Sequence, residues 1–455
     1  MEWLKKREQD CTDRTRAHQD WGMPLTEAQA ITRLLDRFAF SATPVERDRA
    51  TKAGFEATLN GLLKPTGADP GATATPAPAL KPQPKRNADN PDARRQAQQI
   101  EQENRVALGR WWLARMVAAQ HQGVERLTWF WHGHFATSFS KVRPVSLMLT
   151  QNETFRQHAL GDFPTLARKL LVDPAMIHWL DGQKSTVKAP NENLAREFME
   201  LFTLGVGRYS ETDIREGARA LTGWVITDEK AELQPRRQDR KPKTIFGRTG
   251  DFDTAGFADL VLARPEVADF VVGRLWFRLV GDHPMPAPTR ARILSAWRGG
   301  DIAAVLGAIA SDPAFRDETL SLVKSPVEWL VGVLRAVGGQ PKDWSPEDLT
   351  RASQALRAMG QQPFNPPSVG GWPPDSLWLN TATAVARATL AELTATRSGF
   401  EKEAAQSTVD ARISLLAKKF GVEWTSRTTA ALKSADNPRS QLVVAACSPE
   451  VVVSR

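Results

Sequence analysis

The side chains best suited to chemistry lie in one segment, from Asn191 to Phe202. When this segment is projected as an α-helix, at about 100° per residue, its apolar side chains gather on one face. Asn193, Glu197 and Glu200 fall together on the opposite face. Three oxygen-bearing side chains on one strip can bind a metal ion, share a proton or simply face water. The choice among these uses determines whether the protein is an enzyme.

A second candidate group is the pair His132 and His134, which lies among aromatic side chains between Trp129 and Phe139. In an extended segment, a His-x-His pattern directs both imidazoles to one side, which is a common start of a metal site. In a helix the two rings point about 200° apart, and only one of them can serve as a ligand. The structural alternative is one buried, hydrogen-bonded histidine and one at the surface.

Together the two groups predict a mixed nitrogen and oxygen site, if they meet in the folded chain. His132 and His134 with Glu197 or Glu200 would offer ligands for a divalent transition metal such as zinc, manganese or iron. The metal would lower the pKa of a bound water and the spare carboxylate would act as base, which favours hydrolysis. Without a metal, two glutamates with different pKa values can carry out acid–base chemistry on a glycan. The cofactor is therefore left open.

Ion pairing is the structural explanation for the same carboxylates. Arg196 has a glutamate four residues before it on the helix, where the two side chains can pair. Glu197 or Glu200 can pair with Arg215 or Arg219 of the following helix. Such pairs add little stability when buried, but they fix the geometry between helices.

Other cationic and aromatic side chains are candidates for substrate binding. They are Arg196, Arg219 and Lys324 for an anionic group, and Trp372, Trp378 and Asn380 for stacking on and bonding to a sugar. A tryptophan face suits the C–H groups of a sugar ring. Tryptophans clustered with proline are, however, more often the buried anchor of a loop, and a lysine before a helix is more often solvated.

Helical patterns dominate the rest of the chain. Capping boxes at Thr26, Thr43 and Ser325 predict three helix starts, and a long helix is predicted from about residue 93 to 120. There is no series of alternating strands and no repeat of fixed length. The expected fold is mainly α and multi-helical, with at most a short hairpin around residues 244–252.

Composition divides the chain into four segments. Residues 65–92 are rich in proline and alanine, which predicts a linker or long loop. The other segments are an N-terminal helical segment at 1–64, a helical body at 93–395 and a C-terminal helical tail at 396–455. The body holds all the candidate site residues.

The overall composition excludes several classes of protein. The 455 residues are 41% hydrophobic and carry a formal net charge of +8, but no basic stripe interleaved with aromatics predicts sequence-specific binding to nucleic acid. Two cysteines, Cys11 and Cys447, rule out a disulfide framework and a cysteine-based zinc cage. A phosphate-binding loop, a Gly-x-Ser-x-Gly elbow and a His-Glu-x-x-His pair are all absent, which disfavours nucleotide dependence and serine-hydrolase chemistry.

The first residues and the apolar runs of the chain bear on its location in the cell. The first eight residues lack the apolar core of a signal peptide, and no apolar run reaches the length of a transmembrane segment. As written, the sequence predicts a cytoplasmic protein. An exported, periplasmic protein is expected only if the start is mis-assigned or a leader has been trimmed.

Several motifs in a fixed order give the chain a family resemblance. They are Trp129–Phe135, Asn191–Glu197, Leu204–Tyr209, Leu221–Trp224, Lys243–Gly247, Lys324–Glu328 and Pro366–Trp372. Over roughly residues 25–394 the chain resembles the DUF1800 family, a bacterial family of uncharacterised function. The match is densest at the Glu197 helix, which favours a functional role there.

The resemblance leaves two kinds of function open. The first is a metal- or carboxylate-dependent hydrolase that acts on a polymeric or glycan substrate. The second is a non-catalytic assembly partner, because members of the family are commonly encoded beside a sulfatase-like family, DUF1501. A DUF1501-family protein is the partner that this resemblance implies.

Overall fold

A computed structural model of the chain describes residues 24–82, 90–373 and 375–455. These residues are mainly helical, with only small two-stranded sheets, which confirms the predicted fold class. They form two compact units. Unit 1 contains Pro24, Leu25 and Leu160–Leu320, and unit 2 contains Thr26–Ala159 and Ser321–Arg455. No helix of the described ranges has the length and apolar character needed to cross a bilayer.

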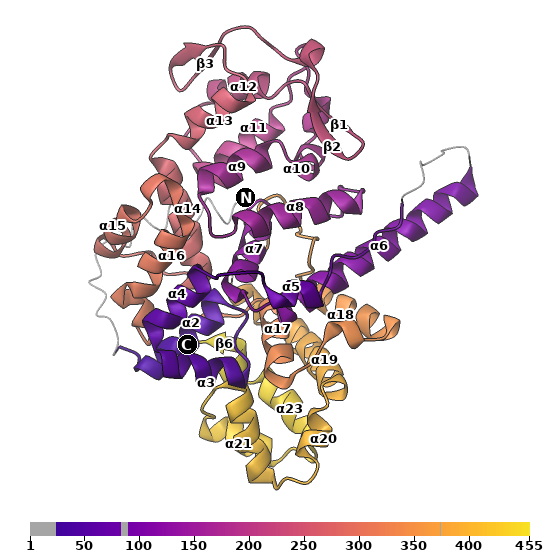
Figure 1. Ribbon diagram of the computed structural model, residues 1–455, viewed down its shortest axis with the longest axis vertical. Coiled ribbons are helices and arrows are strands. Elements are labelled where there is room, and N and C mark those ends of the chain that lie inside the picture. Colours follow the sequence, from indigo (N-terminus) through magenta and orange to yellow (C-terminus); the bar gives the residue numbers. More distant parts are fainter. Residues whose placement is uncertain (1–23, 83–89, 374) are drawn as a thin grey trace. The chain divides into compact units, whose positions relative to one another are not determined.

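Unit 2 is built from both halves of the chain, so its helices run from indigo to yellow in Figure 1. Its first part contains α2 (Glu27–Phe38), α3 (Pro44–Ala53), α4 (Phe55–Leu63), α5 (Pro70–Ala74), α6 (Pro91–Ala118), α7 (Gln122–His134) and α8 (Val145–His158). Its second part contains β5 (Leu322–Val323), α17 (Pro326–Val337), α18 (Pro346–Ala358), α19 (Thr381–Arg397), α20 (Phe400–Ala404), α21 (Val409–Phe420), α22 (Ser426–Lys433), α23 (Pro438–Cys447), α24 (Pro449–Val452) and β6 (Val453–Ser454).

Long-range hydrogen bonds hold the C-terminal residues in unit 2, both within its second part and, through Arg37, to its first part. The short strands β5 and β6 pair in antiparallel fashion. Arg37 of α2 donates to the side chain and the carbonyl oxygen of Ser454, at 3.2 and 3.1 Å. The indole of Trp329 in α17 donates to the carbonyl of Ala446 in α23, at 2.8 Å. The last residues of the chain are therefore part of the core of unit 2.

Local sequence signals explain where these helices begin. The predicted capping boxes at Thr26, Thr43 and Ser325 are all present. At Thr43, for example, the backbone N–H donates to the carboxylate of Glu46. The backbone N–H of Glu46 in turn donates to the hydroxyl of Thr43. The long helix α6 covers nearly the predicted range, starting at Asn90 as its cap.

The described start of the proline-rich segment, residues 65–82, packs against α6. The carbonyl of Thr75 accepts a hydrogen bond from the indole of Trp111 at 3.0 Å. Further on, Lys81 and Asn104 exchange two hydrogen bonds of 2.9 Å between backbone and amide side chain. Composition indicates the lack of long helices in this segment, but it does not show that the segment packs along a neighbouring helix.

Unit 1 carries the Glu197 helix. Its helices are α9 (Phe163–Leu171), α10 (Pro174–Trp179), α11 (Asn193–Glu197), the π-helix η2 (Phe198–Thr203), α12 (Glu211–Ala220), α13 (Thr254–Leu262), α14 (Glu266–Leu279), α15 (Ala287–Ser295) and α16 (Ile302–Ser311). Its strands are β1 (Trp224–Thr227), β2 (Lys230–Leu233), β3 (Lys243–Ile245) and β4 (Arg248–Gly250).

Two hairpins extend from unit 1. The β3–β4 hairpin lies where the sequence predicts one, with Lys243 opposite Gly250. The β1–β2 hairpin was not predicted, because its second strand is polar and shows no alternation. Its two turn residues, Asp228 and Glu229, both have positive φ (46° and 62°), as in the turns that suit the twist of a hairpin.

Candidate functional site

The Glu197 segment is not one continuous α-helix. Its first part, α11, begins where the Asn191 side chain accepts the backbone N–H of Asn193 at 2.9 Å. From Phe198 to Thr203 the chain widens into a π-helix, and the Thr203 hydroxyl donates to the carbonyl of Phe198, five residues earlier, at 2.6 Å. Short π segments inside helices occur frequently at functional sites.

The apolar face of this segment packs as predicted. Leu194, Phe198 and Phe202 are buried, and the Phe198 ring lies 5.8 Å from the ring of Phe257 in α13. This packing fixes the backbone that carries the polar face. Glu197 and Glu200, on that face, are each half-buried.

Glu197 is a carboxyl group that forms no ion pair with any residue that the structure describes. Its side chain also forms no hydrogen bond in the described part of the chain. Burial and the negative charge of Glu200 raise the pKa of Glu197 to about 7, against a smaller lowering by Arg196. At neutral pH this group can therefore both give and take a proton.

Glu200 is held by the single tyrosine of the chain. The hydroxyl of Tyr209 donates a hydrogen bond to Oε2 of Glu200. Burial, this hydrogen bond and the charge of Glu200 all raise the pKa of Tyr209. The proton therefore stays on the phenol, and Tyr209 orients the Glu200 carboxylate.

The neighbouring arginines are all engaged with other residues. Their partners are Glu192 and Glu211 for Arg196, Glu216 and Asp239 for Arg219, and the Thr212 hydroxyl for Arg215. Between the described residues, none of these arginines forms an ion pair with Glu197 or Glu200. The structural explanation considered for the two glutamates is therefore not what the structure shows.

Asn193, the third residue of the predicted polar strip, has a different environment. Its amide nitrogen donates to the carbonyl of Leu180 at 3.3 Å. This contact ties the start of α11 to the turn after α10. The structure thus brings Glu197, Glu200 and Tyr209 together and gives Asn193 a hydrogen bond that fixes the helix start.

His132 and His134 both lie in α7, so the helical alternative applies and their rings do not share a side. His132 is buried, and its Nε2 accepts the backbone N–H of Phe364 at 3.1 Å. Burial lowers the pKa of His132 to about 3, which keeps the ring neutral. The ring of His134, also buried, stacks 5.9 Å from Phe130.

The predicted metal site finds no support. His132 and His134 belong to unit 2, whereas Glu197 and Glu200 belong to unit 1. Within the described ranges, no three His, Cys, Asp or Glu side chains are grouped so that they could hold a metal ion. The Nε2 atom of His132 is also in use as a hydrogen-bond acceptor.

The loop that holds Trp372 and Trp378, called the tryptophan loop below, is part of the core of unit 2. Trp372 is buried and stacks on Trp129, with ring centroids 4.7 Å apart, and it meets the edge of His132. Trp378 is also buried, and its carbonyl accepts hydrogen bonds from Thr383 and Arg387. These rings offer no exposed face to a sugar in this structure.

The two remaining candidates for substrate binding also have partners within unit 2. Asn380 caps α19 by accepting the backbone N–H of Thr383 at 3.0 Å. Lys324 forms an ion pair of 2.9 Å with Asp36 of α2. The first contact fixes the start of α19, and the second joins the residue after β5 to α2.

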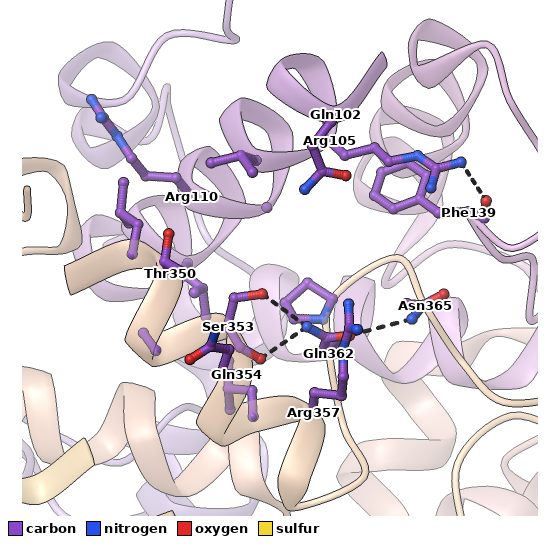
Figure 2. A pocket seen from close by; sticks show the side chains of 17 residues that line it. Gln102, Arg105, Arg110, Phe139, Thr350, Ser353, Gln354, Arg357, Gln362 and Asn365 are labelled. Atoms are coloured by element: carbon purple, nitrogen blue, oxygen red, sulfur yellow. Dashed lines mark hydrogen bonds between the residues drawn. The ribbon is translucent and has the colours of Figure 1, made fainter. Parts of the chain in front are cut away.

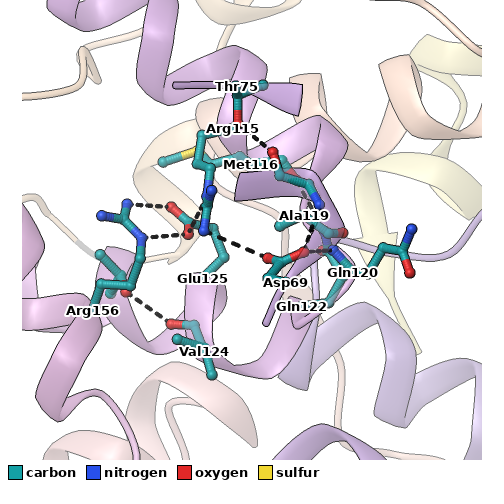
Figure 3. Close-up of polar contacts among 12 residues, drawn as sticks. Asp69, Thr75, Arg115, Met116, Ala119, Gln120, Gln122, Val124, Glu125 and Arg156 are labelled. Atoms are coloured by element: carbon teal, nitrogen blue, oxygen red, sulfur yellow. Dashed lines mark hydrogen bonds and ion pairs between the residues drawn. The ribbon is translucent and has the colours of Figure 1, made fainter. Parts of the chain in front are cut away.

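A buried charge network in unit 2 was missed from the sequence. Figure 3 shows Glu125 between Arg156 and Arg115, with Asp69 beyond Arg115. Arg156 donates two hydrogen bonds of 2.9 Å to Glu125, and the indole of Trp112 donates a third at 2.7 Å. The one available signal was a charged residue inside the aromatic-rich helix 122–134, where a carboxylate must find a partner.

Comparison with known proteins identifies a family. A family model described as "Protein of unknown function (DUF1800)" matches residues 33–453. No curated protein and no solved structure matches the chain. Because the family model covers most of the sequence, including every element of both candidate sites, the chain belongs to the DUF1800 family.

Proposed function

We propose that the protein is a carboxylate-dependent hydrolase acting on a glycan or a related polymer, with Glu197 and Glu200 as its catalytic pair. The observation that carries the proposal is the state of Glu197, a half-buried carboxyl that pairs with no cation in the described part of the chain and has a pKa of about 7. A carboxyl of raised pKa beside a second carboxylate is the usual arrangement for acid–base catalysis.

The two glutamates would have different roles. Protonated Glu197 can donate its proton to the oxygen of the leaving group. Glu200, oriented by Tyr209, can stabilise positive charge that develops on the substrate or accept a proton from water. Because the π-helix interrupts the α-helical register between them, the backbone of this segment sets the angle between the two carboxyl groups.

A direct test is hydrolysis of a panel of nitrophenyl glycosides and labelled polysaccharides by the full chain. Once a substrate is found, E197Q should lower kcat by at least about a hundredfold, since a positioned general acid typically contributes that much. E200Q should be similarly impaired, while E232Q, on the exposed strand β2, should retain activity. Full activity of E197Q would contradict the proposal.

The raised pKa of Glu197 also predicts an effect on stability that needs no substrate. Its folded pKa, about 7, lies above the ordinary value of 4.5, so the folded state binds the proton more tightly. The resulting stabilisation is fully present below about pH 4.5 and is lost as the pH rises through 7. E197Q should therefore exceed the wild type in free energy of unfolding at pH 8, by about 1–2 kcal/mol after allowance for solvent screening.

Urea unfolding of both proteins at pH 5 and pH 8 measures this difference. At pH 5 the two curves should nearly coincide, because wild-type Glu197 is then mostly protonated. E232Q again serves as the control and should follow the wild type at both pH values. A difference between E197Q and the wild type that does not change with pH would show that the pKa of Glu197 is not raised.

A second candidate function, assembly with a DUF1501-family protein, rests on exposed apolar side chains near the tryptophan loop. Leu377, Leu379 and Val385 are 54%, 53% and 64% exposed and lie within nine residues of one another. Large apolar side chains left in water in this way favour a protein contact. If it is the docking site, L379D with V385E should abolish co-purification of the two proteins, whereas V409E on α21 should not.

A further inference from the structure

Unit 1 contains a small cavity between the end of α9, the β1–β2 hairpin and the start of α13. Its volume is ≈ 270 Å³, slightly below the range of drug-sized ligands, so it suits a single ring or a small group. The catalytic pair borders the same helix, because Phe198 packs on Phe257 of α13. Ala255 and Ala258 of α13 line the cavity, whereas neither glutamate of the pair does. A group bound here is therefore separate from the reacting bond.

Trp224 forms an aromatic wall of this cavity. It is half-buried, and its indole N–H donates a hydrogen bond of 2.9 Å to the hydroxyl of Thr254. That hydroxyl in turn donates to the carbonyl of Ala220 at 3.3 Å. Because the one polar donor of the indole is engaged, the ring offers the cavity only its apolar surface. The hydrogen bonds thus fix a large apolar surface at one side of the cavity.

The rest of the cavity surface is mainly apolar and is formed by short side chains. Leu171 and Ala258 are buried there, each 1% exposed. Leu233 lies opposite Trp224 in the β1–β2 pairing, lines the cavity and is 38% exposed. A small apolar group of a ligand that covered Leu233 would remove this surface from water, which is favourable.

Gln238 supplies an amide on the cavity wall. Its side chain forms no hydrogen bond with any described residue. Its backbone is fixed, since the N–H of Asp239 donates to the hydroxyl of Thr222 at 2.7 Å. Gly223, with φ of +100°, permits the close approach, because a Cβ atom there would lie 3.2 Å from Cβ of Gln238. The amide thus has a fixed base and offers both a donor and an acceptor to a ligand.

The charged side chains of the wall leave one carboxylate oxygen available. Asp253 caps α13 by accepting the backbone N–H of Gly256 on Oδ1 at 2.9 Å. Its Oδ2 accepts no hydrogen bond from the described residues. Arg168 is balanced by Asp259, to which its Nε and Nη2 donate at 3.1 and 2.8 Å. With the guanidinium paired, the wall disfavours an anion and favours a ligand that donates a hydrogen bond to Asp253.

The larger cavity between α6 and α18 of unit 2 does not indicate a ligand in the same way. Figure 2 shows that the Gln362 amide on its wall already donates to the carbonyl and the hydroxyl of Ser353, both at 2.9 Å. The oxygen of this amide accepts a hydrogen bond of 3.3 Å from Asn365. Arg110 and Arg357 point apart, and the lining is mainly apolar.

We propose that the cavity at Trp224 binds an N-acetylated sugar unit, an inference that rests on the proposed function in taking this sugar as part of the substrate. The sugar ring lies against Trp224, and the methyl group of the acetamido substituent covers Leu233. The acetamido carbonyl accepts from the amide of Gln238, and its N–H donates to Oδ2 of Asp253. Because the donor and the acceptor of an acetamido group point in opposite directions, the two protein groups need not meet at one point.

Saturation-transfer NMR on the full chain tests this proposal. The probes are N-acetylglucosamine, N-acetylgalactosamine and N-acetylmannosamine, with glucose, galactose and mannose as matched controls. At least one N-acetylated sugar should show transfer to its acetyl methyl protons and bind at least about tenfold more tightly than its parent hexose. Glucosamine carries an ammonium in place of the acetamide. If it binds as tightly as N-acetylglucosamine, or if none of the three N-acetylated sugars binds, the proposal is wrong.

Variants locate the binding. A255L fills the cavity from an exposed position and should weaken binding at least about tenfold, whereas A291L, at an exposed alanine of α15 outside the lining, should leave it unchanged. D253S keeps an oxygen to cap α13 but lacks the second oxygen. It should therefore weaken binding with little change in the unfolding midpoint. Undiminished binding by both A255L and D253S would overturn the site.

The sugar site and the hydrolase proposal fail separately. E197Q should bind the N-acetylated sugar as the wild type does, since Glu197 does not line the cavity. Binding that A255L removes, in a protein that hydrolyses no glycan, would support the sugar site and refute only the catalytic role of Glu197. Hydrolysis that E197Q abolishes, without any transfer to acetyl methyl protons, would refute only the sugar site.

Discussion

Replacing Glu125 with alanine should lower the free energy of unfolding by about 3–5 kcal/mol, the range typical for removal of one partner from a buried ion pair. Glu125 is 1% exposed and accepts hydrogen bonds from Arg156 and from the indole of Trp112. Without it, Arg156 loses its buried partner, and the Trp112 indole loses its acceptor. The cost comes from these uncompensated groups more than from the lost attraction.

Urea unfolding followed by tryptophan fluorescence measures this loss. The matched control is E153Q, because Glu153 also pairs with Arg156, at 2.8 Å, but its side chain is 41% exposed. That change should cost no more than about 1 kcal/mol, as is usual for solvent-exposed pairs. If E125A and E153Q cost the same, the interior position of Glu125 has no energetic role.

The same carboxylate predicts a pH dependence. Burial raises the pKa of Glu125, but the charges of Arg156 and Arg115 and the hydrogen bonds outweigh it, and the net shift is downward. A lowered folded pKa contributes stability above the unfolded value, and this stability is lost as the pH falls through the folded pKa. The wild type should therefore lose stability in acid relative to E125Q, so that the difference between them shrinks as the pH falls.

The sequence predicted the local features of the fold well. Capping boxes at Thr26, Thr43 and Ser325 need only residues three apart, and all three are present. The same holds for the apolar face of the Glu197 helix. The π-helix after Glu197 was not predictable, because it depends on backbone hydrogen bonds five residues apart, such as that from the N–H of Leu204 to the carbonyl of Met199, which periodicity does not encode.

Features that depend on distant contacts were missed or left open. The Glu125 network joins residues from α7, α8 and α6 that have no common motif. The hydrogen bonds of Arg37 to Ser454 join opposite ends of the described chain, so the discontinuous unit 2 could not be recognised from composition. The raised pKa of Glu197 likewise required knowledge of which arginines pair elsewhere, and a helical projection does not supply that.

The second large effect is expected at Gly371, within the proline- and glycine-rich motif before Trp372. Its φ is +81°, in the left-handed region that favours glycine, and a Cβ atom there would lie 2.2 Å from the carbonyl oxygen of Gly133. Both the backbone strain and the collision oppose any side chain. G371A should therefore cost about 2–5 kcal/mol, the sum of a left-handed penalty and of overpacking against backbone.

The adjacent glycine provides the control. A Cβ atom on Gly370 would meet only the Ser368 hydroxyl, at 3.6 Å, and its φ is not positive, so G370A should be close to neutral. Urea unfolding compares the two variants, and near-ultraviolet circular dichroism reports on the aromatic cluster. Because Gly371 allows Trp372 to stack on Trp129 beside His132, G371A should also weaken the near-ultraviolet signal. Equal stability of G370A and G371A would show that the loop does not approach α7 this closely, and the burial of His132 would then need another explanation.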